Sequence, residues 1–244
     1  MELLLGVNSE GIDVTVDLET IRDMFIGGMH KSGKTNYITY LVTSLATQYT
    51  PSELQFLLVN EKKDEFRMFE RLSHLAHPII NDLDECAINI QWLYSEMERR
   101  YRQIARAHNK NIIDYNESAE EKIPRIFFIV DECVSLFQRE DKNSIEKILT
   151  QILSLGKGVG IHFIFTTAYS SDNAVPPMLK VHFNTMGSFA VATEEESTTF
   201  LNFAGAEKLK NSGDLFISLS TNKYRPIILH IPLMNSHPRN KNSY

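Results

Sequence analysis

One short stretch has residue types and a spacing suited to binding a phosphate chain. Gly28 is followed, after four residues, by Gly33, Lys34 and Thr35. Glycine permits positive φ angles and lets backbone N–H groups approach phosphate oxygens closely. The lysine ammonium would contact the β- and γ-phosphates, and the threonine hydroxyl would bind Mg²⁺. The stretch therefore predicts a P-loop that binds ATP together with Mg²⁺.

The flanking sequence favours this interpretation over a glycine-bearing turn with a stray lysine. A short apolar run at 24–26 precedes the loop, as expected of a buried strand, and a helix pattern follows over about 35–49. The N-terminus of such a helix directs its positive dipole end at the phosphates. The residues expected to bind the nucleotide are Gly28, Met29, His30, Lys31, Ser32, Gly33, Lys34, Thr35 and Asn36.

An acidic pair, Asp131 and Glu132, ends the apolar run 126–130 and has the form of a Walker B motif. Asp131 would hold the hydration shell of Mg²⁺ near Thr35, and Glu132 would polarise the attacking water. We expect Lys34 and Glu132 to be catalytic, and Thr35 and Asp131 to bind the metal. The alternative is a strand that simply ends in two solvated acids.

Polar residues end two other predicted strands, at the sheet edge where ligands bind in parallel α/β folds. Thr166 and Thr167 follow the run 161–165 and could sense the γ-phosphate, although hydroxyls are also common in turns. Asn60 and Lys62 follow the run 54–59. They could touch the metal site or a neighbouring subunit, or they could be solvated.

Composition is that of one α/β domain of 244 residues, 43% hydrophobic and 23% charged. No apolar run approaches the roughly 20 residues of a membrane span, and the start lacks the basic region of a signal peptide. We expect a cytoplasmic protein in which Cys86 and Cys133 are reduced thiols. A net charge of -6 argues against a broadly basic surface but leaves room for a local basic channel.

Strand and helix patterns alternate along the chain, which predicts a mostly parallel sheet with helices on both faces. The expected domain is 1–234, with a β-hairpin lead-in at 1–23 and a polar tail at 235–244. The other expected elements are a hairpin over 3–18, a helix over 84–107, a loop over 109–121, a helix over 144–155, strands at 189–191 and 215–217, and an edge strand over 224–231 that tolerates Pro226.

The helix expected over 84–107 has one apolar stripe at spacings of three and four. The stripe consists of Cys86, Ile90, Leu93, Met97, Tyr101 and Ile104. The helix also has a basic end, made of Arg99, Arg100, Arg102 and Arg106. These arginines are either a solvated face, favourable near a helix C-terminus, or a contact for nucleic acid.

Several segments outside the two nucleotide motifs have distinctive sequences: EMERRY at 96–101, NIIDYN at 111–116, GIHFI at 160–164, AGAE at 204–207 and SGDL at 212–215. Together with the P-loop and the acidic pair, they make nearly the whole chain resemble the motor domain of the FtsK/SpoIIIE DNA translocases. The resemblance implies a RecA-like P-loop fold, a homo-oligomeric ring of about six subunits, and double-stranded DNA pumped through its centre. The same superfamily includes conjugative coupling ATPases and EssC-type secretion ATPases, which handle protein.

The chain departs from this family pattern at several positions. Thr167-Ala168 stands where Thr-Gln is usual, and Asn60-Glu61-Lys62 stands where Asp-Pro-Lys is usual. Met186 and Thr198 replace two family arginines. An arginine supplied across a subunit interface can be worth roughly 10³–10⁵ in rate, so efficient hydrolysis is in doubt. Other cations that a neighbour might supply are Lys62, Arg139 and Lys157.

The leading hypothesis is thus an ATPase that moves double-stranded DNA. One alternative is a secretion or conjugation module with a protein cargo, and another is a nucleotide-binding subunit with little hydrolysis. The winged-helix module and membrane anchor of the translocases are not in this sequence, which suggests an excised domain or a short mobile-element relative. DNA-facing loops are expected within 133–160, where the cations are Arg139, Lys142, Lys147 and Lys157.

Overall fold

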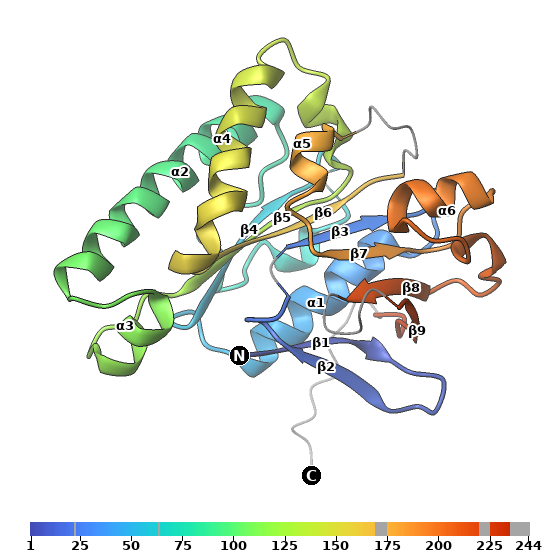
Figure 1. Ribbon diagram of the computed structural model, residues 1–244, viewed down its shortest axis with the longest axis horizontal. Helices are drawn as coiled ribbons and strands as arrows, with labels where there is room; N and C mark the ends of the chain where they lie inside the picture. Colours follow the sequence, from blue (N-terminus) through green and yellow to red (C-terminus); the bar gives the residue numbers. More distant parts are fainter. Residues whose placement is uncertain (22, 63, 169–174, 220–224, 235–244) are drawn as a thin grey trace.

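One mixed sheet runs through the described part of the chain in the computed structural model (Figure 1). The description covers residues 1–21, 23–62, 64–168, 175–219 and 225–234. Within these residues the sheet has nine strands. In order across the sheet they are β2 (Asp13–Asp17), β1 (Glu2–Val7), β9 (Ile227–His230), β8 (Asp214–Leu219), β7 (Thr185–Ser188), β3 (Met24–Gly27), β6 (Ile161–Thr166), β5 (Arg125–Val130) and β4 (Leu54–Val59).

The sheet is parallel on one side and antiparallel on the other. β7, β3, β6, β5 and β4 pair in parallel, whereas β8, β9, β1 and β2 join antiparallel. The carboxyl ends of the parallel strands therefore meet at one edge. β6 lies between β3, which enters the P-loop, and β5, which ends in the acidic pair. The predicted P-loop α/β fold is confirmed, with a larger antiparallel share than expected.

Helices cover both faces of this sheet, as expected (Figure 1). α1 (Lys34–Gln48) packs on one face through an apolar core that includes Tyr37, Leu41 and Leu45. The other face carries α2 (Leu83–Arg106), α4 (Lys142–Leu155), α5 (Pro177–Lys180) and α6 (Glu194–Leu201). Short 3-10 helices complete the connections: η1 (Arg67–Phe69), η2 (Cys133–Phe137), η3 (Gly156–Val159) and η4 (Ala206–Lys208).

α2 matches the long amphipathic helix expected from the sequence, with two differences. Asp82 caps its start by accepting hydrogen bonds from the N–H groups of Asp84 and Glu85. The apolar stripe is buried except for Tyr101, whose side chain lies at the surface. Arg100 is 2% exposed and pairs with Glu96 at 2.8 Å, so it belongs neither to a solvated face nor to a nucleic-acid contact.

A short helix, α3 (Ile112–Ser118), occupies the stretch that we expected to be a loop. The Asn111 side chain caps it by accepting from the N–H groups of Ile113 and Asp114. Buried Ile112 anchors it to the core. The expectation was wrong because a capped two-turn helix has too few apolar positions to show a period.

Two strand expectations near the C-terminus are also corrected. β7 is Thr185–Ser188, before the predicted 189–191, because its register with β3 places Gly187 opposite Ile26. β9 pairs with β8 on one side and with β1 on the other, so it is not an edge strand. Pro226 lies just before it. Residue 224 and the predicted tail at 235–244 lie outside the described residues.

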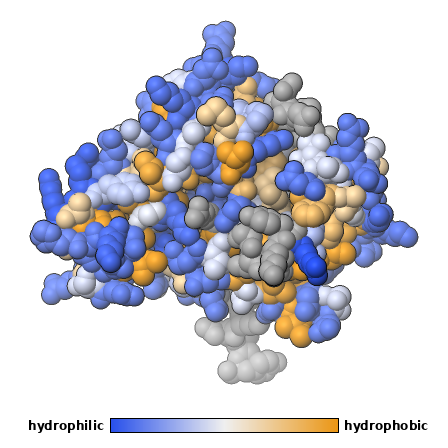
Figure 2. All heavy atoms as spheres, in the orientation of Figure 1, coloured by the Kyte–Doolittle hydropathy of each residue, from blue (hydrophilic) through white to orange (hydrophobic). Residues whose placement is uncertain are grey.

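In the described part, the residues on one face and the two cysteines contrast in their surroundings. The face in Figure 2 is mostly hydrophilic, with hydrophobic residues in separate patches. Among the described helices, none is long and apolar enough to span a bilayer. Cys86 and Cys133 are free and buried, as expected of reduced thiols, and burial raises the pKa of Cys86 to about 12.

Candidate nucleotide site

The predicted P-loop is the turn between β3 and α1. Gly28 and Gly33 have φ angles of 142° and 126°, a region that favours glycine. A Cβ on Gly28 would lie 2.8 Å from the Cβ of Phe189 and the hydroxyl of Ser32. The two glycines are therefore required by backbone conformation and close packing, and they place the start of α1 at the carboxyl edge of the sheet.

Lys34 is buried and turns back over this loop. Its ammonium donates hydrogen bonds to the carbonyls of Gly28, at 2.9 Å, and Met29, at 3.1 Å. It also forms an ion pair with Glu132, with the Nζ and Oε1 atoms 3.2 Å apart. The two residues predicted to be catalytic are thus in direct contact, although Lys34 begins α1 and Glu132 follows β5.

Asp131 accepts hydrogen bonds from three side chains. The donors are the hydroxyl of Thr35, at 2.8 Å, the amide of Asn60, at 3.1 Å, and the hydroxyl of Thr166. Burial raises the pKa of the Asp131 carboxyl, and the hydrogen bonds from Thr166 and Thr35 oppose that rise. The predicted metal pair, Thr35 and Asp131, is therefore brought together, and Thr166 supports it from the end of β6.

Glu132 is held by its backbone and by the end of β6. Its φ of 57° is a left-handed conformation that non-glycine residues rarely adopt. Its N–H donates to the Thr166 hydroxyl at 3.2 Å, and its carboxylate accepts from the N–H of Ala168 at 2.8 Å. Ala168 occupies the position where the family pattern has glutamine, and here its main chain contacts the acid instead.

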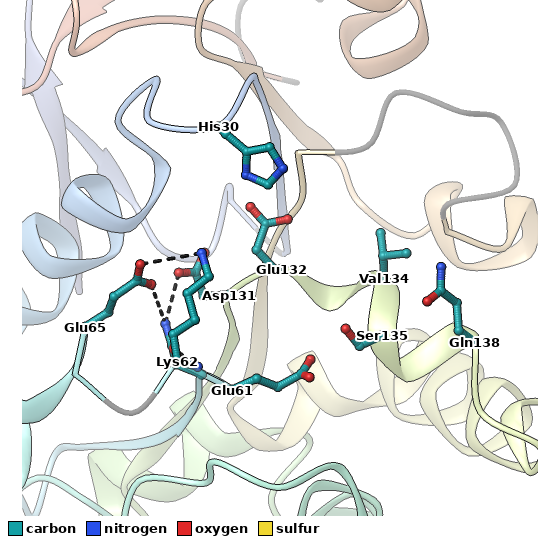
Figure 3. Close-up of a pocket in the computed structure, with 10 residues that line it drawn as sticks. His30, Glu61, Lys62, Glu65, Asp131, Glu132, Val134, Ser135 and Gln138 are labelled. Atoms are coloured by element: carbon teal, nitrogen blue, oxygen red, sulfur yellow. Dashed lines mark hydrogen bonds and ion pairs between the residues drawn. The ribbon is translucent and has the colours of Figure 1, made fainter.

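A cavity of about 260 Å³ opens beside these groups (Figure 3). The close-up shows Asp131 and Glu65 close together and Glu132 directed toward His30. Glu65 was missed by the sequence analysis. Its carboxylate accepts from the Asn60 amide at 3.0 Å, and the same amide contacts Asp131. The signal in the sequence was the polar stretch after β4, but the sequence does not show which of its acids turns toward Asp131.

The remaining expected residues differ in their surroundings. His30, Lys31, Gly33, Thr35 and Asn36 line a second cavity, of about 480 Å³, which extends from Lys34 along the P-loop. The Asn36 side chain contacts residues 232 and 234, as described below. Met29 donates its N–H to the carbonyl of Ala190. The roles of all these residues toward a nucleotide stay predictions.

The cations proposed for a neighbouring subunit are in different situations. Lys62 lines both cavities, and its ammonium lies 3.6 Å from Glu65. Arg139 forms ion pairs with Asp84 and Asp141, each at 2.8 Å, so its guanidinium is not a free cation. Lys157 donates to the carbonyl of Glu19 from η3, which precedes β6 and so lies at the opposite edge of the sheet.

The residues that replace the two family arginines offer no positive charge. Met186 packs against the hydrophobic core, and the hydroxyl of Thr198 donates to the carbonyl of Glu194 within α6. That these two positions correspond to family arginines, and that their loss slows hydrolysis, both stay predictions.

The donors at this edge suit Mg²⁺. This ion prefers oxygen ligands and is usually bound through one or two carboxylates, waters and substrate phosphates. The Thr35 hydroxyl and the Asp131 carboxylate lie 2.8 Å apart, and Asn60 and Glu65 adjoin them. In the described residues, no three histidine, cysteine or acidic side chains gather as a self-contained metal cluster.

A sequence model of the FtsK/SpoIIIE family matches residues 1–176. The chain belongs to this family. Its members are P-loop ATPases, and the convergence of Lys34, Thr35, Asp131 and Glu132 is the arrangement that this chemistry needs. The recognition of this family from the sequence motifs is confirmed.

Curated relatives are similar across most of the chain. DNA translocase SftA of Bacillus subtilis (strain 168) is 30% identical over 230 residues, which is 92% of this chain and 24% of that protein. DNA translocase FtsK of Tropheryma whipplei (strain TW08/27) is 30% identical over 235 residues, 91% of this chain and 32% of that protein. The chain thus spans about a quarter of the length of the first relative and about a third of the second.

Solved structures with the same fold include proteins of other systems. The pCW3 conjugation coupling protein TcpA, in a monomer form with ATPγS, superposes with a TM-score of 0.83 at 17% identity, over 96% of this chain and 66% of that one. The cytoplasmic domain of the type VII secretion ATPase EccC of Thermomonospora curvata gives 0.83 at 21% identity, over 99% and 29%. At these identities the similarity establishes the fold.

Proposed function

We propose that this domain binds MgATP and hydrolyses it. The observation that carries the proposal is the meeting of four side chains from two places in the fold, the start of α1 and the end of β5. Lys34 and Thr35 begin α1, and Asp131 and Glu132 follow β5, with contacts of 2.8 Å for Thr35–Asp131 and 3.2 Å for Lys34–Glu132. A structure with ATPγS among those of the same fold supports the choice of nucleotide.

Each of the four residues has one role in the proposed reaction. The Lys34 ammonium stabilises negative charge on the β- and γ-phosphate oxygens, and the P-loop N–H groups orient them. Thr35 and Asp131 would hold Mg²⁺, which neutralises phosphate charge when bound. Glu132 orients a water and accepts its proton as that water attacks. The Ala168 N–H keeps the Glu132 carboxylate at the end of β6.

The test separates binding from turnover. Lys34→Ala should remove most affinity for MgATP, because the ammonium charge acts on the phosphates. Glu132→Gln should retain binding and abolish turnover, since Glu132 acts on the water. Calorimetry measures the affinity, phosphate release measures the rate, and Lys147→Ala on the exposed surface of α4 is the control. If Lys34→Ala binds ATP as tightly as the parent, the P-loop assignment is wrong.

We further propose that hydrolysis drives movement of double-stranded DNA by an oligomer of this domain, with a ring of about six subunits as the working geometry. The support is that the two curated relatives above are named DNA translocases. In a ring, the carboxyl edge of the sheet would face a neighbouring subunit. Lys62, whose side chain is 63% exposed, is the described cation at that edge best placed to contact the nucleotide of the neighbour. With its two reduced thiols, the domain would work in the cytoplasm.

A protein cargo is the second candidate. Three observations favour a protein cargo. The net charge is -6, and Arg139 is paired with two carboxylates. The fold is also shared with a structure of EccC in complex with a signal sequence peptide. Steady-state ATPase rates with linear duplex DNA and with a cargo peptide distinguish the two. Stimulation by duplex supports the DNA motor, and stimulation by the peptide alone moves protein cargo to first place. A very low rate with both favours a nucleotide-binding subunit with little hydrolysis, as the missing arginines suggest.

A further inference from the structure

The larger cavity at the P-loop has two chemically different ends. One end is lined by Lys62, Glu65 and Glu132, and the other by Ser212 and Leu233. β5 lies on one side of β3 in the sheet, and β8 and β9 lie on the other. The cavity therefore crosses the start of α1, from the acids after β5 to the segment 231–234 after β9.

Asn36 holds that segment in place. Its side-chain amide donates to the carbonyl of Pro232 at 3.1 Å, and its side-chain oxygen accepts from the N–H of Met234 at 3.0 Å. This pair of hydrogen bonds reproduces the pattern by which one strand binds another. The sequence analysis expected Asn36 to bind nucleotide. The structure shows that its side chain fastens residues 232–234 beside the first turn of α1.

Gly213 fixes the other side of the segment. Its carbonyl accepts from the N–H of Ile231 at 2.8 Å, and its own N–H contacts the carbonyl of Ser32 in the P-loop at 3.4 Å. The φ of Gly213 is 93°, and a Cβ there would lie 2.9 Å from the carbonyl oxygen of Ile231. A larger residue would therefore push the segment away from the P-loop.

Leu233 is the residue that this scaffold presents to the cavity. Ile231 is 1% exposed and anchors the segment in the core, whereas Leu233 is 78% exposed and lines the cavity together with Lys31 and Asn36. The apolar side chain of Leu233 is therefore exposed to water, and a flat apolar group of a ligand could bury it. If the neighbouring P-loop holds the phosphates, as proposed above, a nucleotide anchored there would extend its base along the cavity.

We propose that Leu233 forms one wall of the nucleobase subsite, with Asn36 and Gly213 as the residues that position it. This inference rests on the proposed binding of ATP. The ligand group is the purine ring, which contacts the leucine by apolar packing. The triphosphate stays with the P-loop, so the two halves of the nucleotide are bound by separable parts of the structure.

The experiment compares two ligands by calorimetry: ATP, which has a base, and inorganic tripolyphosphate, which has none. Leu233→Ser should weaken ATP binding about tenfold, because the base no longer packs on an apolar side chain, and should leave tripolyphosphate affinity unchanged. Leu233→Met, which keeps an apolar side chain at this position, should bind ATP as the parent protein does. Asn36→Ala should show the same selective loss, because it releases residues 232–234. The matched control is Ile228→Ser, a 53% exposed residue of β9 that does not line the cavity.

Three results would overturn the inference. Unchanged ATP affinity in Leu233→Ser would show that Leu233 does not contact the base. Equal losses for ATP and tripolyphosphate would indicate a general disturbance of the P-loop. A loss of the same size in Ile228→Ser would point to the antiparallel strands as a whole. Failure of the proposed function gives a different result, since the parent protein would then bind neither ligand.

Discussion

Asn60 is the side chain that joins the two carboxylates beside the P-loop. It is 2% exposed, and its amide donates to Asp131 at 3.1 Å and to Glu65 at 3.0 Å. The family pattern has an acid at this position. In this chain the amide supplies a donor where an acid would add a third negative charge, so Asn60 stabilises the pair of carboxylates when no cation is bound.

Asn60→Asp should therefore destabilise the nucleotide-free protein by about 1–3 kcal/mol at neutral pH, because a buried donor becomes a like charge. Mg²⁺ should recover part of that loss. Urea unfolding with and without the ion measures both effects. Asn211→Asp is the control, because Asn211 donates to Asp214 at 2.9 Å in an exposed position and the same change should cost less than about 1 kcal/mol. Equal losses at the two sites would contradict this account of Asn60.

At the scale of elements, buried Arg100 connects α2 to the turn that precedes β6. Its guanidinium pairs with Glu96 at 2.8 Å and donates to the carbonyl of Val159 in η3 at 3.0 Å. Burial lowers the pKa of Arg100, and the hydrogen bond and charge of Glu96 oppose the change. Arg100 thereby links α2 to the turn that leads into β6, whose far end carries Thr166.

Arg100→Ala should lower the free energy of unfolding by about 3 kcal/mol, because it leaves the Val159 carbonyl unpaired and opens a cavity. Arg102→Ala on the same helix is the control. Arg102 is 62% exposed and 3.8 Å from Glu98, so its removal should cost less than about 1 kcal/mol. Chemical denaturation of both variants measures the difference. Similar values for the two would show that Arg100 is not a structural connection.

A feature of the site can be predicted from the sequence when it depends only on residues that are close together in the chain. Lys34, Thr35, Asp131 and Glu132 can be found in the sequence because short patterns define them. The inward turn of Glu65, the pairing of Arg139 with Asp84 and the Ala168 contact cannot, because each depends on residues distant in the chain. A mostly parallel sheet with helices on both faces could be expected from the alternation, whereas the order of the strands could not. β7 and α3 have too few apolar positions to predict their bounds.

For the whole molecule, the net charge of -6 means that DNA can be bound only through a concentrated patch, mainly at phosphates. The pairing of Arg139 removes one of the cations expected within 133–160. Lys142 and Lys147 on α4 remain exposed, toward the carboxyl edge of the sheet. They are the described cations of that interval best suited to contact a duplex near the nucleotide.

Changing Lys142 and Lys147 to glutamate should weaken duplex binding for all sequences alike. It should also flatten the salt dependence by roughly one unit for each phosphate that the protein no longer neutralises. Fluorescence anisotropy across a salt series measures both. The control changes Lys110 and Lys122 to glutamate, which alters the net charge equally at exposed positions outside the interval 133–160. Equal weakening by both pairs would mean that net charge alone acts, and a parent without duplex affinity at low salt would exclude the DNA motor.

The contact between Lys34 and Glu132 makes the arrival of nucleotide an exchange of partners. The ammonium needed at the phosphates is held by the proposed base, 3.2 Å away. In the proposed reaction Lys34 contacts the β- and γ-phosphates, so a bound nucleotide would draw the ammonium away from Glu132. Without nucleotide the proposed base is thus occupied by the same lysine that the substrate needs, and binding of the substrate would free its carboxylate for water.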